Sequence, residues 1–225
     1  MTKASLIEAF FMKLALQRAV LLISTTFFAQ KKVLKTVQTN ASSINIQTEG
    51  LDTIVLENAE GNLLEVWLYA EEYDHQIISI DTKPSEVNIG FEFEGFETRE
   101  VIFRKYITKG LQRAYAVVKI PADRRVTIYG TNVDIDSKNL KDDLNIYIDN
   151  GIIKLNSIFA NTSVKFYSGN IYATVNNTNL EILSAEGNIN WNTKEYKKEI
   201  KRFSKDNKKG LHIETVKANV FLTSR

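Results

Sequence analysis

The segment Leu144-Asn-Ile-Tyr-Ile-Asp-Asn-Gly-Ile-Ile-Lys-Leu155 carries the clearest structural signal in the chain. Its first three aliphatic residues stand at every second position, so they point to one side of an extended strand. The alternation changes phase across Gly151, after which Ile153 and Leu155 point to that same side. Glycine suits such a corner because it accepts positive φ without a Cβ clash. The segment therefore predicts two short strands joined by a sharp bend.

The same pattern recurs with a period of 18 residues. Three columns show it: Ile128, Ile146, Val164 and Ile182; Ile135, Ile153, Ile171 and Ile189; Val133, Gly151, Gly169 and Gly187. Similar aliphatic residues in a fixed register stack as ladders when successive coils hydrogen-bond to one another. We therefore expect the C-terminal half to be a parallel β-solenoid with about 18 residues per coil.

Upstream of this repeat, short runs of β-branched and aromatic residues follow one another about every 10–12 residues, which is typical of an all-β chain. The runs lie at 44–46, 54–56, 66–69, 77–80, 87–89 and 115–120. Pro121 ends the last run because proline lacks the backbone N–H that a ladder needs. We expect these strands to continue the same sheet system, so that residues 31–225 form a single domain.

Two other all-β architectures fit the repeat less well. A β-sandwich explains alternation but gives no reason for a fixed 18-residue register. A left-handed hexapeptide β-helix requires an aliphatic residue at every sixth position. The positions that test this requirement hold Lys141, Tyr147, Phe159 and Asn177.

The composition limits the function classes open to the chain. Its 225 residues are 44% apolar and 25% charged, as in ordinary folded proteins. The net charge of +2 argues against a dedicated polyanion binder. Cysteine is absent, which excludes disulfides, thiolate metal sites and a thiol nucleophile.

The N-terminal region has the layout of a targeting segment. Lys13 and Arg18 precede an uncharged, largely apolar run of 11 residues at 19–29. A run of this length suits a signal peptide and is too short to span a bilayer, which takes about 20 residues. We therefore expect residues 1–30 to be a signal peptide, and the layout favours Met12 over Met1 as the start. The mature protein would be periplasmic, on the cell surface or secreted, with no transmembrane anchor.

Residues 194–209 interrupt the repeat and concentrate positive charge. They contain eight basic and three acidic residues, a net charge of +5. Tyr196, Ile200 and Phe203 recur at the spacing of a helical face. We expect an inserted loop or short helix, followed from Leu211 by a final coil that covers the open end of the solenoid. The candidate polyanion contacts are Lys197, Lys198, Lys201 and Arg202.

The sequence contains little that resembles catalytic or metal-binding chemistry. His75 and His212 are isolated from each other in sequence, and the acids around His75 read as an exposed turn. Asp134 and Asp136 alternate on one strand at about 7 Å, within the range of paired glycosidase carboxylates. Solvated residues flanking an inward Ile135 explain them better. We expect no catalytic residue, no cofactor and no metal.

Several segments resemble a known family. They are Tyr115-Ala-Val-Val-Lys-Ile-Pro-Ala-Asp-Arg-Arg-Val-Thr-Ile128, Gly169-Asn-Ile171 and Gly187-Asn-Ile189. With the signal peptide and the early strands, they resemble the bacterial putative-adhesin family of uncharacterised exported β-solenoid proteins. The resemblance covers most of residues 40–225 and implies a surface interaction role. It carries no catalytic residue over to this chain, and the lysine-rich insert departs from the family pattern.

Three functional hypotheses follow. The first is an exported, non-enzymatic, adhesin-like structural or interaction protein that contacts an unidentified surface or envelope component, either protein or glycan. The second is a carbohydrate-active β-helix enzyme, and the third is a polyanion-binding protein that uses residues 194–209. No nucleic-acid partner is expected. The candidate surface contacts for the first hypothesis are Tyr147, Lys165, Tyr167 and Tyr172.

Overall fold

The computed structural model describes residues 31–70, 76–93 and 114–224, and every regular element in these ranges is a β-strand. The strands are β1 (Lys31–Gln38), β2 (Ser43–Gln47), β3 (Thr53–Asn58), β4 (Leu63–Ala70), β5 (Gln76–Thr82), β6 (Glu86–Phe93), β7 (Tyr115–Ile120), β8 (Arg125–Asn132), β9 (Asp134–Ser137), β10 (Asp143–Leu155), β11 (Thr162–Val175), β12 (Asn179–Trp191), β13 (Lys194–Arg202), β14 (Gly210–Thr215) and β15 (Asn219–Ser224). The described ranges hold no helix long and apolar enough to cross a membrane.

The strands form where apolar and polar residues alternate. β7 is a clear case, because Ala116, Val118 and Ile120 are buried while the residues between them are partly exposed. β-Branched residues favour this extended geometry because their side chains pack well on a pleated surface. Pro121 follows the last residue of β7 and ends the strand, as the sequence predicts.

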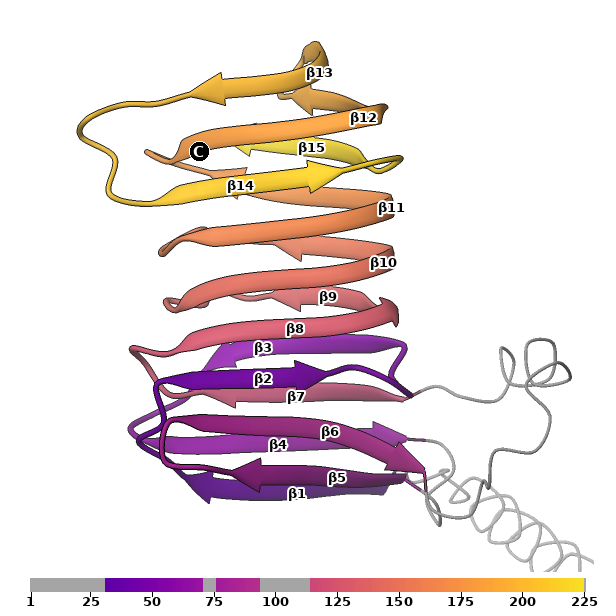
Figure 1. The fold of residues 1–225 in the computed structure, drawn as a ribbon, viewed down its shortest axis with the longest axis vertical. Coiled ribbons are helices and arrows are strands. Elements are labelled where there is room, and N and C mark those ends of the chain that lie inside the picture. Colours follow the sequence, from indigo (N-terminus) through magenta and orange to yellow (C-terminus); the bar gives the residue numbers. More distant parts are fainter. Residues whose placement is uncertain (1–30, 71–75, 94–113, 225) are drawn as a thin grey trace, which may run out of the picture. The chain divides into compact units, whose positions relative to one another are not determined.

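The strands stack in two facing walls (Figure 1). The front wall consists of β5, β6, β2, β8, the first halves of β10, β11 and β12, and β14. The back wall consists of β1, β4, β7, β3, β9, the second halves of β10, β11 and β12, and β15. β10, β11 and β12 therefore turn a corner and contribute to both walls.

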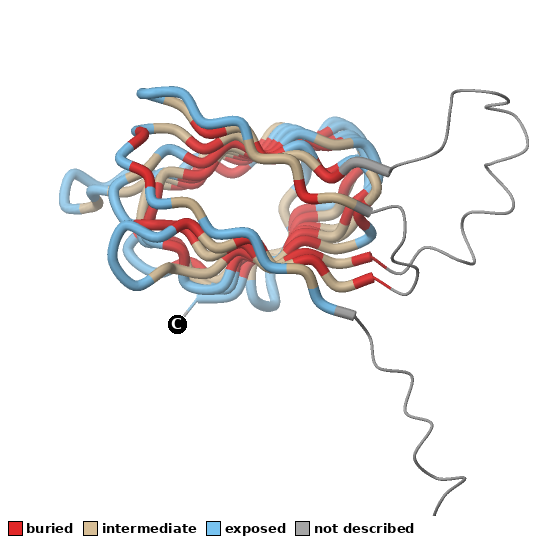
Figure 2. Tube along the Cα trace, turned by 90° about the horizontal axis from the view of Figure 1, so that it is seen from below, coloured by how far each residue is buried: buried red, intermediate tan, exposed pale blue. Residues whose placement is uncertain are grey.

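Buried residues lie along both walls (Figure 2), and their aliphatic side chains form one core between the walls. Along the front wall, Ile128, Ile146 and Val164 lie on successive strands and are fully buried. Burying one such side chain contributes about 1.5–3 kcal/mol relative to leaving it in water. The aliphatic columns in the sequence therefore supply much of the core.

The 18-residue spacing is present in the pairing of three strands. Ile128 of β8 lies beside Ile146 of β10, which lies beside Val164 of β11. On the back wall, Ile153 lies between Ile135 and Ile171. All of these pairings are parallel.

The regular succession of coils ends after β11. β14 and β15 are inserted between β11 and β12, so the sheet order is β10, β11, β14, β12, β13. Val220 of β15 consequently lies between Ile171 and Ile189, which do not stack directly. The expectation of one unbroken line of these isoleucines is wrong. The expectation that a final coil covers the open end is also wrong, because that coil lies inside the stack.

Residues 194–202 form strand β13 and not the expected loop or short helix. β13 pairs antiparallel with β12 through the two-residue turn Asn192–Thr193. Tyr196 lies beside Ile189 of the back wall, and Ile200 lies beside Ile182 of the front wall, with a register shift between the two pairs. The exposed edge of β12 favours the strand, since pairing satisfies its backbone groups.

The predicted fold class, a parallel β-solenoid in the C-terminal half, is corrected by these findings. The protein is all-β, but its described strands form one mixed sheet wrapped around a single core. Four of the fifteen described pairings are antiparallel, namely β1–β4, β4–β7, β5–β6 and β12–β13. Short connections that reverse the chain produce antiparallel neighbours such as β5–β6 and β12–β13. The predicted signal peptide at 1–30 and His75 lie outside the described residues.

Candidate functional site

The outer face of the front wall carries three rows of side chains that cross β8, β10, β11, β14 and β12. Outward residues of adjacent strands lie beside one another because the strands are in register. The first row contains Arg125, Asp143, Asn161, Gly210 and Asn179. The second row contains Thr127, Asn145, Ser163, His212 and Glu181. The third row contains Tyr129, Tyr147, Lys165, Glu214 and Leu183.

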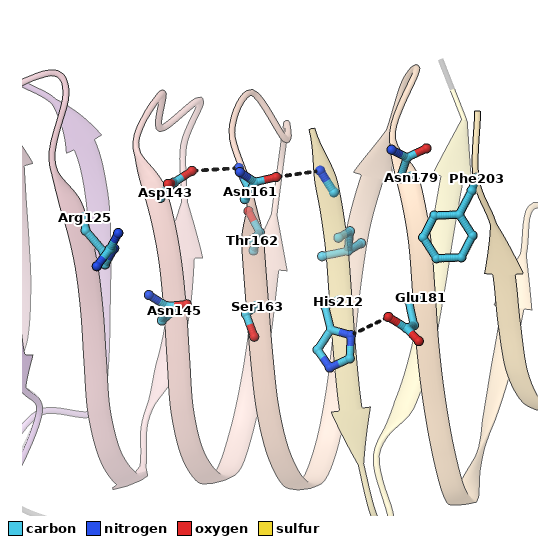
Figure 3. A pocket seen from close by; sticks show the side chains of 12 residues that line it. Arg125, Asp143, Asn145, Asn161, Thr162, Ser163, Asn179, Glu181, Phe203 and His212 are labelled. Carbon is cyan, nitrogen blue, oxygen red and sulfur yellow. Dashed lines mark hydrogen bonds and ion pairs between the residues drawn. The ribbon is translucent and has the colours of Figure 1, made fainter. Parts of the chain in front are cut away.

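A groove of about 250 Å³ lies along the first and second rows (Figure 3). Gly210 has no side chain and leaves space in the middle of the first row. A Cβ at Gly210 would meet the Asn161 side-chain oxygen at 3.7 Å and the Asn179 carbonyl oxygen at 3.9 Å, which are ordinary contact distances. Phe203, which follows β13, lies at the rim and is 66% exposed.

Hydrogen bonds between neighbouring strands hold the first row in place. The backbone N–H of Asn161 donates to Asp143 Oδ1 at 3.0 Å, and the N–H of Gly210 donates to Asn161 Oδ1 at 3.1 Å (Figure 3). In the same way, the N–H of Ser204 donates to Asn179 Oδ1 at 2.8 Å. Asp143 and Asn161 each keep a second polar atom that has no hydrogen bond to a described residue, whereas Asn179 Nδ2 donates to the Asn207 carbonyl oxygen at 3.2 Å. The groove wall is therefore ordered before any ligand arrives.

The middle of the groove contains polar side chains that form no hydrogen bond with other described residues. Asn145 and Ser163 face outward in the second row and form no side-chain hydrogen bond with another described residue. An amide both donates and accepts hydrogen bonds, and a hydroxyl does so as well. The groove can therefore bind a ligand rich in hydrogen-bonding groups.

A chain of charged residues connects the second and third rows. His212 Nδ1 lies 3.3 Å from Glu181, and His212 Nε2 lies 3.2 Å from Glu214. Glu214 also pairs with Lys165 at 3.4 Å. The hydrogen bond from His212 and the positive charge of Lys165 lower the pKa of Glu214 below its usual value. Glu214 is thus held as a carboxylate between two basic groups.

A second, shallower depression of about 660 Å³ lies at the third row and the adjoining corner. Three of the predicted surface contacts, Tyr147, Lys165 and Tyr167, line it together. Leu183, which is 49% exposed, and Val216 complete an apolar border around them. Tyr147 also stacks on Tyr129 with ring centroids 5.4 Å apart. We call this the tyrosine depression.

The fourth predicted contact, Tyr172, lies elsewhere. It projects from the back wall and stacks on Phe221 of β15 with ring centroids 5.0 Å apart. The phase change at the corner of β11 separates it from Tyr167, since residues on either side of the corner face different walls. Tyr172 therefore does not belong to the face that carries the other three contacts.

The predicted polyanion contacts lie on β13, the last strand of the described sheet. Lys197, Lys198, Lys201 and Arg202 are all exposed. Lys201 pairs with Glu199 at 3.7 Å, and the Arg202 guanidinium lies 5.1 Å from the centre of the Trp191 ring. Part of this charge is thus already engaged within the protein.

The carboxylates considered for glycoside chemistry have structural partners. The N–H of Ile152 donates to Asp134 Oδ1 at 2.8 Å, and the Asn156 amide donates to Asp136 Oδ1 at 2.7 Å. These bonds connect neighbouring strands at the back wall. Among the described residues, no group of three or more histidines, acids or cysteines is arranged to hold a metal ion.

The sequence alone does not indicate that His212, Gly210 and Phe203 belong to one groove. Glu181 could have been found, because it stands 18 residues after Ser163 and 36 after Asn145. His212 could not, because β14 inserts beside Ser163 from a distant part of the chain. No sequence period links the two positions.

Comparison with known proteins identifies the fold. No family model and no curated protein sequence matches this chain. A crystal structure of a putative cell adhesion protein from Clostridium sporogenes superposes with a TM-score of 0.60 at 13% identity, over 87% of this chain and 99% of that one. The two proteins share one fold. At this identity the likeness extends to architecture alone.

Two further solved structures align over a similar length with lower scores. A putative adhesin from Bacteroides fragilis has a TM-score of 0.31 at 9% identity, covering 88% of this chain and 98% of that one. A putative adhesin from Parabacteroides merdae has a TM-score of 0.28 at 12% identity, covering 88% and 97%. The Clostridium sporogenes protein, which shares the fold, carries a cell adhesion name, in agreement with the resemblance noted from the sequence.

Proposed function

We propose that this protein is an exported, non-enzymatic, adhesin-like binding protein that contacts a surface or envelope component through the outer face of its front wall. The observation that carries the proposal is the tyrosine depression. There Tyr147, Lys165 and Tyr167 meet on one face, and 48% of Tyr167 is exposed. Exposed tyrosines beside apolar side chains in a surface hollow are typical of binding surfaces.

The sheet supports this role by holding the contacts rigidly. Tyr147 and Lys165 lie on strands that pair in parallel along their whole front halves. Their backbones therefore lose little conformational freedom when a ligand binds, which lowers the entropic cost of association. Tyrosine adds contact area at a small cost in side-chain entropy.

Export rests on the N-terminal sequence. Lys13 and Arg18 followed by the apolar run at 19–29 have the order of a signal peptide. Cell fractionation with N-terminal sequencing of the mature protein tests this part. We expect a chain that begins close to Lys31 in an extracytoplasmic fraction, and an uncleaved cytoplasmic chain would contradict export.

Binding is tested with purified full-length protein and an envelope fraction from the producing cells. We expect the double variant Tyr147→Ala/Tyr167→Ala to lose about tenfold in affinity, as removal of aromatic anchors does. Tyr172→Ala is the matched control because that tyrosine has an exposed fraction between those of Tyr147 and Tyr167 but lies on the back wall. Equal binding by the double variant and the wild type would overturn the proposed face.

A second candidate function is binding of a polyanion at β13. It is favoured by the net charge of +5 at 194–209 and by the exposure of Lys197 and Lys198. Salt-dependent retention on heparin that is lost when Lys197, Lys198, Lys201 and Arg202 are all changed to alanine would support it. Retention unchanged by these substitutions would exclude β13 as the contact.

A further inference from the structure

The groove beside the tyrosine depression has the chemistry of a sugar site. Its polar lining combines amides at Asn145 and Asn161, a hydroxyl at Ser163 and carboxylates at Asp143 and Glu181. A sugar hydroxyl donates to a carboxylate and accepts from an amide, so it can satisfy both kinds of group. The lining offers these groups on side chains of adjacent strands, about 4.8 Å apart.

We infer that this groove, between Asp143 and Phe203, binds a neutral saccharide. The inference rests on the proposed function and names the ligand class for its binding face. The groove and the tyrosine depression are neighbours, because His212 lines the groove and hydrogen-bonds Glu214, which lines the depression. A glycan chain lying along the wall would contact both.

The charges of the groove favour a neutral ligand over an acidic one. Asp143 and Glu181 place two carboxylates in the lining, opposed by Arg125 and by His212. His212 is already engaged with Glu181 and Glu214. A phosphate or sulfate would meet the carboxylates at close range without a free cluster of basic groups, whereas uncharged hydroxyls meet no such penalty.

Phe203 supplies the apolar element that a sugar ring requires. It is 66% exposed at the rim of the groove and is not part of the core (Figure 3). The nonpolar face of a sugar ring packs on an aromatic ring while its hydroxyls reach the polar wall. The groove presents side-chain groups from paired strands, so a peptide could not add to it as another strand.

Gly210 provides a sharp test. A larger side chain at this position would occupy the groove, yet its Cβ would make only ordinary contacts. Gly210→Leu should therefore fill the groove without unfolding the protein. Gly90→Leu is the matched control, because Gly90 faces outward on β6 of the same wall and its Cβ would meet only Ser79 at 3.9 Å.

The experiment titrates full-length protein with soluble chitotriose, cellotriose and mannotriose, each up to about 10 mM, followed by saturation-transfer NMR. Sialyllactose and heparin serve as anionic probes. We expect at least one neutral trisaccharide to bind, with affinity lowered at least about tenfold by Gly210→Leu and by Asn145→Ala, and unchanged by Gly90→Leu. Circular dichroism confirms that each variant is folded.

Three results would overturn the inference: no binding of any neutral trisaccharide, binding that Gly210→Leu leaves intact, or tighter binding of an anionic probe in the groove. These results are separate from the test of the proposed function. If Tyr147→Ala/Tyr167→Ala abolishes envelope binding while no trisaccharide binds, the proposed binding face at the tyrosine depression is supported and the saccharide site is refuted. If a trisaccharide binds in the groove while the tyrosine substitutions leave envelope binding unchanged, the saccharide site is supported and the proposed binding face is refuted.

Discussion

Single residues at the corners control how closely neighbouring strands approach. Gly169 lies where β11 turns from the front wall to the back wall, with φ at +127°. A Cβ at this position would collide with the carbonyl oxygen of Gly151 on the neighbouring strand. Gly187 has no positive φ, yet a Cβ there would collide with the carbonyl oxygen of Ala218. A Cβ at Gly151 would likewise collide with the carbonyl oxygen of Val133, so close approach requires glycine at all three corners.

Gly169→Ala should lower the free energy of unfolding by about 3 kcal/mol or more, because the clash involves backbone atoms that cannot move aside. Gly61→Ala is the control: Gly61 also has positive φ, at +72°, but a Cβ there would meet nothing within 4 Å. It should cost only about 1 kcal/mol. Urea denaturation measures both, and equal losses would show that φ alone matters.

Asp142 gives the protein a pH-dependent weakness. It is 4% exposed, its Oδ1 accepts the Arg124 N–H at 2.7 Å, and its Oδ2 has no partner among the described residues. Burial raises the pKa of this carboxyl above its ordinary value of 3.8. The folded protein therefore binds the proton of this carboxyl more tightly than the unfolded chain does. As the pH rises above about 3.8, the carboxyl loses this proton and the free energy of unfolding falls.

Asp142→Asn should raise the free energy of unfolding by about 1 kcal/mol near neutral pH, because the amide keeps the Oδ1 acceptor and carries no buried charge. The gain should shrink below about pH 3.8, where the wild-type carboxyl is protonated in both states. Urea denaturation across pH tests this, with the exposed Asp149→Asn as control. If Asp142→Asn raised the free energy of unfolding by the same amount at every pH, the buried charge of Asp142 would not be the cause.

At the scale of elements, the C-terminal strands act as an internal part of the stack. β14 lies between β11 and β12 on the front wall, and β15 lies between the same strands on the back wall. Both supply buried residues, among them Ile213 and Val220. Their removal would leave facing edges of β11 and β12 without backbone partners.

Truncation after Lys209 removes β14 and β15, and it should therefore cause the C-terminal half to unfold or aggregate. If these strands only covered the end of the stack, the truncated protein would remain folded as a shorter stack. Light scattering and circular dichroism distinguish the two outcomes. The double variant Lys205→Ala/Lys208→Ala, in the exposed connection before β14, is the control and should fold normally. A soluble, folded truncated protein would show that the inserted strands are dispensable.

At the scale of the whole molecule, stability should decrease toward the ends of the stack. β10 has paired neighbours on both sides in both walls, whereas β13 pairs with β12 alone among the described strands. Terminal strands lose fewer contacts when they open, so local opening starts there. The lysines on β13 suit this position because charge on an edge strand discourages pairing with other chains.

Native-state hydrogen exchange should thus show slower exchange for amides of β10, such as that of Ile146, than for amides of β13, such as that of Ile200. Both residues are buried, so exposure of the side chain does not account for the difference. Because the chain has no cysteine, a reducing agent should leave both rates unchanged. Equal rates in the two strands would indicate that the sheet opens only as a single unit.

The order of residues along the chain is enough to predict the all-β class, most strands, the corner at Gly151 and the in-register columns from β8 to β11. These features depend on alternation and repetition, which are local properties of a chain. It also brought Tyr147, Lys165 and Tyr167 together as candidate contacts, since they stand on consecutive strands.

The folded structure was needed to reveal the mixed sheet, the insertion of β14 and β15, and the extended conformation of β13. It also created the groove, where His212 and Gly210 lie beside Ser163 and Asn161. The physical reason is that an insertion breaks the period, and the position of the following strand is then set by which open edge it can pair with and which core it can fill. The spacing of residues along the chain indicates neither the edge nor the core.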